Sequence, residues 1–331
     1  MKLFLPGVGN KIEHIRCFKN VMQIEKIIIS DIYDWTFGAE VADIAYILPT
    51  YKDTEKYLYK LEKIYEKEKF DICIPIDDYA LYFFSKNKNK LSNCLMSKIA
   101  INNSEIVELV SDKLSIYRFL HNLKMPTPQT FTLKDFLAFG NYEYPYFLKP
   151  RYINMLRAAN RGFYFQISSD LDLDYIARKV VNHEDSYVVQ KLLTGKEYNI
   201  DLFCDSEGVL KSYVVLEKLE MGLNRGITRG EIVLEHPFHE YINIIVNSLK
   251  LYGANQIQAF ITDTEKVVFT EINGRFSGSS VFVKAAGVDY FKAFIDLFSG
   301  KKVEINDKPS LLKMSTAQEH FYYNKSKYSL L

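Results

Sequence analysis

The length, composition and charge of the chain limit what it can be. Its 331 residues are 48% hydrophobic and 25% charged, a globular composition that excludes disordered and fibrous chains. Because a common domain has roughly 100 to 200 residues, we expect two or three packed units. Lys and Arg number 42 against 41 Asp and Glu, a formal net charge of +1, so no long-range field draws the chain onto nucleic acid or an anionic membrane.

The cysteines and the N-terminus indicate the compartment. The 4 cysteines form no CxxC pair, which argues against a zinc site or a disulfide framework and for a reducing compartment. The first residues, MKLFLPGVGN, contain an apolar run too short for the hydrophobic region of a signal peptide. No apolar run in the sequence approaches the roughly 18 residues of a membrane span. We therefore expect a cytoplasmic protein that is not inserted in a membrane.

The N-terminal part alternates short apolar runs with segments of helical period, which is typical of a parallel α/β sheet. Strands are expected at Lys2–Leu5, Lys26–Ser30, Ile44–Leu48 and Asp71–Ile74. Between the last two, apolar residues from Leu58 to Tyr65 recur at helical spacing and predict a surface helix. A further helix is expected to begin at Ser111 and Asp112, where either side chain can cap it, and to end before Pro126 and Pro128.

Two more units are predicted after these prolines. The first is a small α+β unit, with strands at Tyr146–Lys149, Phe163–Ile167 and Tyr187–Gln190 and a helix at Asp170–Val181. The second is a larger sheet whose strands alternate as antiparallel strands do. Its strands are expected at Glu197–Phe203, Val209–Glu217, Asn255–Thr262 and Lys266–Ile272, with a helix at about His239–Leu251. The tail from Asn306 has no period and is expected to cover an edge.

A glycine turn follows the first strand. Gly7 and Gly9 stand between that strand and a helix, where backbone N–H groups can face an anion. Asp31 closes the second strand, where a ribose-binding acid would stand in a dinucleotide site, but position 12 is Ile rather than the third glycine of G-x-G-x-x-G. A tight turn without a ligand is equally compatible with the pattern.

A basic cluster surrounds the end of the 146–149 strand. Lys149 ends this apolar strand, and Arg151, Arg157 and Arg161 follow it. Guanidinium groups suit phosphate oxygens, and a lysine at a strand end needs a partner. The alternative is an exposed basic hairpin tip.

A set of oxygen ligands is the sharpest pattern in the chain. Glu271 and Asn273 stand two apart on one strand and so share a face, and Gln258 lies on the strand expected to pair with it. One carboxylate with two amides fits Mg²⁺ held together with a nucleotide better than a Ca²⁺ cage. The alternative, a polar strand in solvent, fits poorly with the apolar residues on both sides.

A fourth pattern runs from Val188 to Tyr198. An apolar strand ends at Gln190, a linker with Gly195 follows, and the next strand opens at Glu197. The backbone groups of such an edge can hydrogen-bond to a purine, while the carboxylate accepts hydrogen bonds from the ribose hydroxyls. An ordinary loop between strands is the alternative.

In this order, the four patterns resemble the ATP-grasp superfamily, specifically its carbamoyl-phosphate-synthetase-like branch, over Lys2 to about Val303. The resemblance implies an α/β and α+β fold with an N-terminal parallel α/β (pre-ATP-grasp) domain at 1–110. It further implies an ATP-grasp domain at 111–305, made of a small lid subdomain at about 128–192 and a C-terminal mixed-sheet subdomain, and a tail at 306–331.

The resemblance also implies roles for single residues. Lys113 matches the basic residue that approaches the nucleotide, and Lys149 matches the strand lysine on its phosphates. The adenine and ribose positions are Gln190 beside the amino group, Lys191 and Leu192 with backbone groups for the ring, and Glu197 on the ribose. The metal ligands of the E-x-N-P-R signature are Gln258, Glu271 and Asn273, and its arginine is Arg275.

Two positions depart from the family pattern. Gly274 replaces the signature proline, and the lid loop at 152–160 lacks the family's glycine run. Arg157 or Arg161 would then make phosphate contacts that glycine backbone makes elsewhere.

The implied reaction is an ATP-dependent ligation of a small-molecule carboxylate to an amine through an acyl phosphate, with ATP and Mg²⁺ as cofactors and Mn²⁺ as the alternative metal. Lys149 and Arg275 would neutralise charge in catalysis. Arg225 and Arg229, on a glycine-flexed loop, would hold the substrate carboxylate together with Arg275. No nucleic acid or membrane partner is expected, and a homodimer is left open. The alternatives are an ATP-sensing protein with a disabled lid and a nicotinamide-dependent oxidoreductase.

Overall fold

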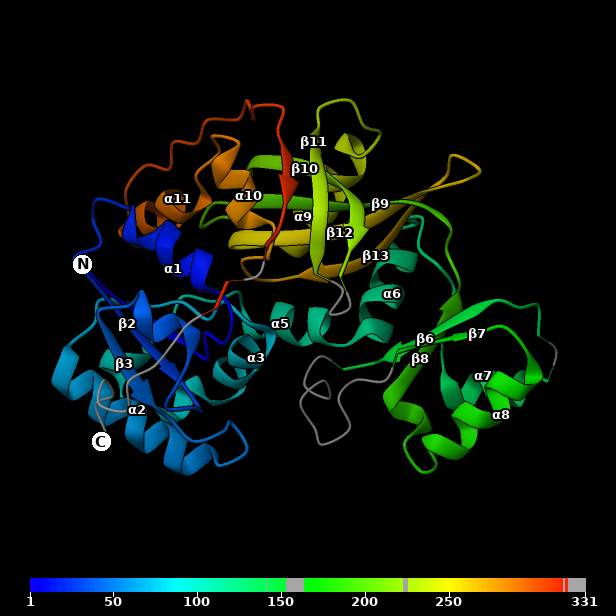
Figure 1. Ribbon diagram of the computed structural model, residues 1–331, viewed down its shortest axis with the longest axis horizontal. Coiled ribbons are helices and arrows are strands. Elements are labelled where there is room, and N and C mark those ends of the chain that lie inside the picture. Colours follow the sequence, from blue (N-terminus) through cyan, green and yellow to red (C-terminus); the bar gives the residue numbers. More distant parts are fainter. Residues whose placement is uncertain (141, 153–163, 223–225, 318, 321–331) are drawn as a thin grey trace.

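The computed structural model describes residues 1–140, 142–152, 164–222, 226–317 and 319–320. These residues form a four-stranded sheet near the N-terminus, a second four-stranded sheet, and a six-stranded sheet. Figure 1 shows the N-terminal sheet and the second sheet on either side below the six-stranded sheet. Among the described helices, none is both long and apolar enough to cross a membrane.

The N-terminal sheet is parallel, in the order β3-β2-β1-β4. Its strands are β1 (Lys2–Pro6), β2 (Lys26–Asp31), β3 (Ile44–Ile47) and β4 (Ile72–Cys73), which confirms the predicted strands. Alternate residues of β1 enter different cores: Leu3 and Leu5 pack on one face of the sheet and Phe4 on the other. Burial on both faces explains why these strands read as continuous apolar runs.

Helices cover both faces of this sheet and continue the N-terminal part. They are α1 (Ile12–Lys19), η1 (Phe37–Glu40), α2 (Thr54–Glu68), α3 (Asp78–Asn87), η2 (Lys88–Lys90), α4 (Asn93–Met96), α5 (Ser104–Ser111) and α6 (Lys113–Asn122). The predicted cap is confirmed for α6, where the Asp112 side chain accepts a hydrogen bond from the Leu114 N–H. The α2 helix places Leu58, Leu61 and Ile64 in the core, as the apolar spacing predicts.

The second sheet, in the order β5-β8-β6-β7, is antiparallel and carries its own core. Its elements are β5 (Thr130–Thr132), α7 (Leu133–Phe139), β6 (Tyr146–Pro150), β7 (Phe165–Ile167), α8 (Asp170–Lys179), η4 (Glu184–Ser186) and β8 (Tyr187–Lys191). The three predicted strands and the helix are confirmed. The sequence analysis did not predict β5 or α7. The three residues of β5 are too few to show an alternation of apolar and polar residues. We call this unit, from 128 to 192, the lid subdomain.

The six-stranded sheet is in the order β13-β12-β9-β10-β11-β14. Its elements are β9 (Gly195–Cys204), β10 (Leu210–Met221), β11 (Ile227–Val233), α9 (His239–Leu249), β12 (Gly253–Thr262), β13 (Val267–Asn273), α10 (Ser280–Ala285), α11 (Tyr290–Phe298) and β14 (Lys313–Ser315). Each of its five pairings is antiparallel, so the sheet is not mixed. The described end of the tail does cover an edge, since β14 pairs with β11.

The N-terminal sheet and the six-stranded sheet share one apolar core. Ile15 and Phe18 of α1 lie in the same cluster as Phe276, Phe291 and residues of α11. Phe18 packs edge-on against both of these rings, with centroids 5.5 and 4.9 Å away. These two parts of the chain are therefore held as one body.

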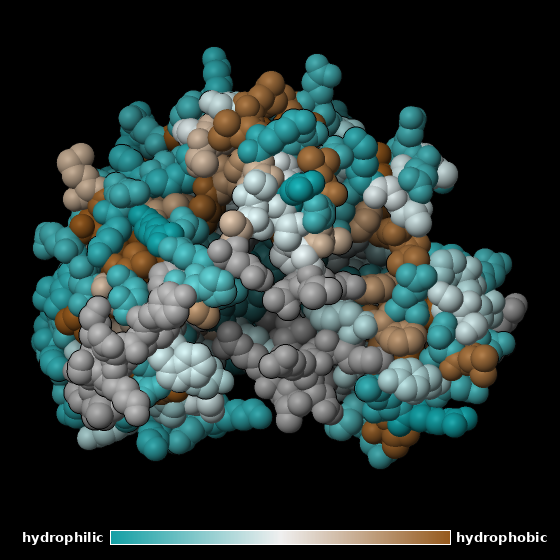
Figure 2. All heavy atoms as spheres, viewed as in Figure 1, coloured by the Kyte–Doolittle hydropathy of each residue, from teal (hydrophilic) through white to brown (hydrophobic). Residues whose placement is uncertain are grey.

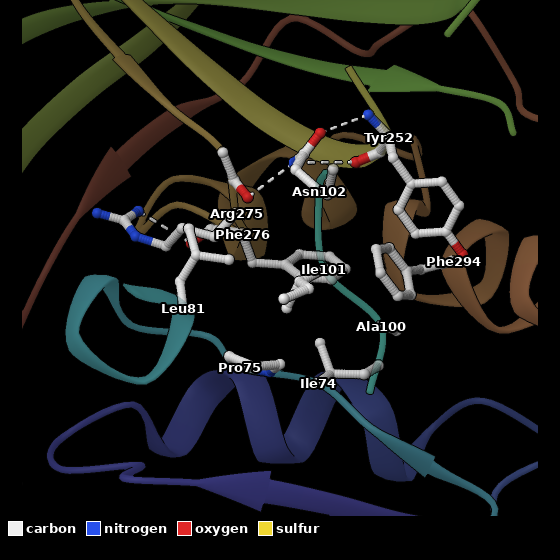
Figure 3. A pocket seen from close by; sticks show the side chains of 12 residues that line it. Ile74, Pro75, Leu81, Ala100, Ile101, Asn102, Tyr252, Arg275, Phe276 and Phe294 are labelled. Carbon is white, nitrogen blue, oxygen red and sulfur yellow. Dashed lines mark hydrogen bonds between the residues drawn. The ribbon is translucent and has the colours of Figure 1, made fainter. Parts of the chain in front are cut away.

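Asn102 fastens the same junction (Figure 3). Its Nδ2 donates to Asn255 Oδ1 (2.9 Å) and to the Gly274 carbonyl (3.0 Å), and its Oδ1 accepts from the Tyr252 N–H (2.7 Å). The pocket beside it has a volume of about 10 Å³, which is about the room for one water molecule. This pocket is too small for a substrate.

Candidate functional site

One face of the six-stranded sheet gathers the predicted metal ligands. Gln258 on β12 lies directly opposite Glu271 on β13, and Gln256 lies opposite Asn273. The sequence prediction that Gln258 pairs with the strand of Glu271 is thereby confirmed. Asn273 is 2% exposed, whereas Glu271 and Gln258 are half-buried at the rim of this face.

Gln256 joins these side chains. Its Oε1 accepts hydrogen bonds from Gln258 Nε2 and from Asn273 Nδ2, both at 3.3 Å. Because the Asn273 amide nitrogen is bound in this way, its Oδ1 is turned away as an acceptor. This Oδ1 is buried and has no hydrogen-bond partner among the described residues.

A buried amide oxygen without a donor is costly unless a ligand satisfies it. A carboxylate and two amide oxygens on one face fit Mg²⁺, which takes oxygen ligands and completes its shell with phosphates and water. In the described part of the chain no three His, Cys, Asp or Glu side chains gather to hold a metal.

A buried acid lies on the same face, opposite Gln256. Asp201 on β9 is 0% exposed, and its carboxylate accepts hydrogen bonds from Ser277, from Ser279 (2.5 Å) and from Ser280 (3.0 Å). Burial raises the pKa of Asp201, while the serine donors oppose the rise. Ser279 also accepts from Gln256 Nε2 at 2.9 Å, so the serine turn after Arg275 is tied to the residue that orients Asn273.

Glu197, the predicted ribose acid, has a partner that the sequence did not indicate. Lys218 on β10 stands opposite Glu197 on β9 and donates to its Oε1. The lysine side chain is 6% exposed and the glutamate side chain 17%. The acid is thus fixed on the same face as Gln258, because Gln258 pairs with Asn199, two residues further along β9.

The two predicted phosphate-side lysines lie near the junction of lid and large sheet. Lys113 is the first residue of α6 and is 5% exposed, and Lys149 on β6 is 8% exposed. Arg151 holds this junction together. Its Nε and Nη2 donate to the two carboxylate oxygens of Asp112 at 2.8 and 2.7 Å, and its carbonyl accepts from the Lys113 N–H at 3.0 Å.

The predicted adenine edge lies on β8 and just after it. Gln190 is buried, and its Nε2 donates to Thr130 Oγ1 at 2.6 Å. Lys191 donates to the Glu143 carbonyl and lies over the Tyr146 ring, 4.9 Å from its centroid. The Leu192 N–H already donates to the Pro145 carbonyl at 3.1 Å, so in this structure that N–H is engaged within the lid.

Arg275 points toward the N-terminal part of the molecule. Its Nε and Nη2 donate to the two carboxylate oxygens of Asp78, at 2.8 and 2.6 Å. Burial alone would raise the pKa of Asp78, but the charge and hydrogen bonds of Arg275 outweigh it and hold this pKa below its ordinary value. Lys11 and Lys113 lower it further, which places α3, Arg275 and Lys113 in one charged cluster.

Two of the predicted substrate arginines, Arg229 and Arg275, lie on or next to strands β11 and β13, which are not neighbours in the sheet. Arg229 lies within β11, not on a loop, and its Nε lies 3.4 Å from Glu220 Oε2 on the neighbouring strand. The prediction of a flexed loop at Arg229 was therefore wrong, because β11 pairs antiparallel with β10 and places Arg229 opposite Glu220, next to a register shift in β10. Arg225 lies outside the described residues, as do Arg157 and Arg161 of the lid loop.

The glycine turn after β1 is closed by side chains. Asp31 accepts from the Gly9 N–H at 3.0 Å and from Thr36 Oγ1 at 2.9 Å through one oxygen, and from the Ile32 N–H at 2.6 Å through the other. A Cβ placed on Gly7 would lie 2.6 Å from the Tyr51 hydroxyl. This arrangement leaves Asp31 to shape the turn and does not present it to a ribose.

Comparison with known proteins places the fold. Residues 183–320 match the family model described as "ATP-grasp in the biosynthetic pathway with Ter operon". The carbamoyl phosphate synthase large chain of Acidobacterium capsulatum is 25% identical over 221 residues, covering 62% of this chain and 20% of that protein. This chain thus spans about a fifth of the length of the curated relatives that it matches.

Solved structures extend the likeness over nearly the whole chain. An L-amino acid ligase from Bacillus licheniformis superposes with a TM-score of 0.71 at 15% identity, covering 90% of this chain and 74% of that one. The chain therefore has the ATP-grasp fold, and its residues 183–320 match an ATP-grasp family model. The biotin carboxylase domain of the Hydrogenobacter thermophilus 2-oxoglutarate carboxylase, solved with MgADP, ADP and bicarbonate, gives a TM-score of 0.67 at 16% identity and covers 91% of this chain and 70% of that one.

Four residues stand at the site without having been predicted: Asp78, Asp201, Lys218 and Gln256. Asp78 is 197 residues away from Arg275 in sequence, so no local pattern could join them. Gln256 and Asp201 could have been found, since both continue the two-residue period of Gln258 and Glu197 on their strands.

Proposed function

We propose that the chain is an ATP-dependent carboxylate–amine ligase that works through an acyl phosphate. The observation that carries the proposal is the face of β12 and β13, where Glu271, Gln258 and the unsatisfied Asn273 Oδ1 come together. The family model and the ligase and carboxylase folds support it. The substrates would be a small-molecule carboxylate and an amine.

In the proposed reaction, an oxygen of the substrate carboxylate attacks the γ-phosphorus of ATP and the bond to ADP breaks. The amine nitrogen then attacks the acyl carbon, loses a proton, and phosphate leaves. The substrate supplies the nucleophile, so the protein needs only to position the groups and to neutralise charge.

The chain's own residues divide this work. Glu271, Gln258 and Asn273 would hold Mg²⁺, or Mn²⁺ in its place, which supplies Lewis-acid stabilisation of the phosphate oxygens. Lys149 and Lys113 add positive charge at the phosphates. Glu197, fixed by Lys218, would accept from the ribose hydroxyls, and Gln190, Lys191 and Leu192 would line the adenine.

Arg275 has a narrower part in this proposal. Because Asp78 holds its guanidinium, Arg275 would contribute positive charge and keep the loop after β13 in place. Its remaining N–H groups would be available to phosphate or substrate oxygens. Arg225 and Arg229 stay candidates for the substrate carboxylate. We retain the division into domains at 1–110 and 111–305, a tail at 306–331, action in the cytoplasm, and a homodimer as an open state.

Of the two rival proposals, the oxidoreductase needs other residues than the ligase, and the ATP sensor differs from it only in lacking turnover. A nicotinamide site would need Asp31 for a ribose, but both of its oxygens are taken by the glycine turn. An ATP sensor would bind nucleotide on the same face without turnover. Figure 2 shows hydrophilic and hydrophobic side chains interspersed over one face of the molecule. Either ATP-binding protein would hold its nucleotide between the six-stranded sheet and the lid.

Two measurements test the proposal. Thermal unfolding with Mg-ATP and, separately, with NAD should show stabilisation by Mg-ATP alone, of about 2.7 kcal/mol at roughly 100 times the Kd. ADP release is then measured with a panel of acids and amines. A ligase is expected to release ADP only when one acid and one amine are both present. Stabilisation by NAD would overturn the proposal in favour of the oxidoreductase. Stabilisation by Mg-ATP without release of ADP for any pair would favour the sensor.

A further inference from the structure

The N-terminal sheet carries a large cleft at the carboxyl ends of its strands. Its volume is about 1360 Å³, and the residues that line it follow β1, β2 and β3 or lie on α2 and α3. In open parallel sheets, ligands bind at this edge. None of the residues that line the cleft lies on β12 or β13.

Aromatic side chains dominate the lining. Eight of them line the cleft, from three separate segments: Tyr33, Trp35, Phe37, Tyr51, Tyr57, Tyr79, Tyr82 and Phe83. Tyr33 and Trp35 are each 57% exposed and Phe37 is 39% exposed, and the first two rings lie 5.6 Å apart, tilted by 36°. Three exposed rings within the five residues from Tyr33 to Phe37 leave apolar surface in water. Such surface marks a binding site.

The glycine turn argues against a phosphate in this cleft. The Tyr51 hydroxyl covers Gly7, and Asp31 already accepts the Gly9 N–H. The backbone groups that would cradle a pyrophosphate are therefore covered or used. A flat, largely apolar group fits the lining better than a nucleotide.

The charges of the lining favour an acid over an amine. Of the three charged residues that line the cleft, two are lysines, Lys52 and Lys86, and the third is Asp31. Lys86 pairs with Glu108 at 2.8 Å, while both oxygens of Asp31 accept loop donors. An ammonium group would find no free carboxylate among these lining residues, whereas an anion meets Lys52.

One wall of the cleft is linked through α3 to the end of the strand that carries candidate metal ligands. Tyr79 lines the cleft, and the preceding residue, Asp78, holds Arg275, two residues after Asn273. A ligand that lies on the aromatic wall can therefore extend past Tyr79 toward the oxygen ligands of β13.

We infer that this cleft binds the carboxylate substrate and that this substrate carries an aromatic ring. The inference rests on the proposed ligase function and adds the class of acid. The ring lies against Tyr33 and Trp35, and the carboxylate points past Tyr79 to the γ-phosphate.

The chain offers its own probe, because Trp35 is its 1 tryptophan. Trp35 fluorescence is titrated in the full chain, without nucleotide, with 3-phenylpropanoate, hexanoate and 2-phenylethylamine. We expect 3-phenylpropanoate to quench or shift the emission and to bind about 10-fold more tightly than hexanoate, and the amine to bind no better than hexanoate.

Two variants locate the binding. Tyr33→Ser removes a ring that is 57% exposed and should weaken 3-phenylpropanoate binding about 10-fold without changing the melting temperature. The matched control, Tyr59→Ser, removes a 65% exposed tyrosine of α2 that does not line the cleft, and should leave binding unchanged.

Equal binding of hexanoate and 3-phenylpropanoate, tighter binding of the amine, or an unaffected Tyr33→Ser variant would each overturn the inference. These outcomes are separable from failure of the ligase proposal. If ADP release depends on acid and amine but shows no preference for aromatic acids, the ligase stands and the cleft assignment falls. If Trp35 reports the aromatic acid but no acid and amine pair releases ADP, the cleft binds the acid and the ligase proposal falls.

Discussion

Arg275 and Asp78 form a two-pronged ion pair, of 2.8 and 2.6 Å, between the end of β13 and the start of α3. The pair connects the strand of the candidate metal ligands to the N-terminal sheet, and the side chains are only 14% and 21% exposed. Removing one partner of such a pair leaves a poorly solvated charge behind.

Asp78→Asn is therefore expected to lower the free energy of unfolding by about 2 to 3 kcal/mol, the lower part of the range for buried pairs because solvent reaches part of Asp78. Denaturant unfolding measures this. The control is Glu66→Gln, which breaks an exposed pair with Lys63 and should leave stability unchanged. Equal effects of both variants would mean that the Arg275 pair is a surface contact in solution.

His14 should make stability fall in mild acid. It is 3% exposed, its Nε2 donates to the Ser277 carbonyl at 2.7 Å, and burial, helped by the nearby Lys11, lowers its pKa to about 3. The folded protein then resists a proton that the unfolded chain takes up below pH 6.5, so stability is lost as the pH falls from 6.5 toward 3.

The expected loss between pH 7 and pH 5 is about 2 kcal/mol from this group, at 1.36 kcal/mol per pH unit below 6.5. His14→Gln keeps an N–H donor for Ser277 and should flatten this part of the pH profile. Unfolding curves at several pH values compare the two proteins. A profile of unchanged slope in the variant would show that His14 does not stay neutral in the folded protein.

Glu271→Gln removes the single carboxylate among the candidate ligands while keeping its shape. We expect ADP release to fall at least 100-fold, because the metal loses its anionic ligand, and the melting temperature without nucleotide to stay the same. Glu265→Gln, at the exposed turn of the same hairpin, is the matched control. Full activity of Glu271→Gln at limiting Mg²⁺ would remove Glu271 from the metal site.

Lys149→Ala should raise the KM for ATP and lower kcat together, since a charge at the phosphates helps the ground state and the transition state. Steady-state kinetics with varied ATP measures both. Lys134→Ala removes a 69% exposed lysine of the lid and should change neither constant. An effect confined to the KM of the acid substrate would place Lys149 in the substrate pocket.

Gln256→Leu tests the residue that orients two candidate ligands. Without its Oε1, the amides of Gln258 and Asn273 are free to rotate, and we expect the Mg²⁺ concentration for half-maximal activity to rise about 10- to 100-fold. Gln166→Leu, on the exposed face of β7, is the control. If only kcat falls and the Mg²⁺ dependence is unchanged, Gln256 supports the fold and not the metal ligands.

The sequence predicted elements that are long or fully buried, and it failed at edges and distant contacts. The strands around Leu3 and Ile27 are continuous apolar runs, and the Gln258 and Glu271 pairing follows from two neighbouring strands. Lys218 was missed because the predicted strand ended at Glu217, one residue too early. The β11 strand was missed because its glycines resemble a loop, and only its pairing with β10 makes it a strand.

The site was predicted to the extent that its residues lie on one strand pair. The alternation of β13 indicated Glu271 and Asn273, but nothing local shows that Asn273 Nδ2 is bound and that its oxygen is left as an acceptor. The partner of Arg275 and the serine donors to Asp201 depend on which loops meet in three dimensions. The aromatic cleft likewise combines segments that are separate in the sequence.

The separation of the apolar cores decides which part of the molecule can turn as a unit. The lid core consists of Leu133, Phe136, Leu148 and other residues between 133 and 189, and none of these belongs to another cluster. The N-terminal sheet and α11, by contrast, draw on one shared cluster. A rotation of the lid would therefore leave its own apolar core intact and would act on the contacts at the junction, among them the Asp112–Arg151 pair and the hydrogen bond from the Lys113 N–H to the Arg151 carbonyl. Moving the N-terminal sheet away would instead expose Phe18 and Phe291. If the lid subdomain rotates about this junction, the aromatic cleft and the strands of the candidate metal ligands are expected to keep a constant distance from each other, because their shared core is not part of the moving unit.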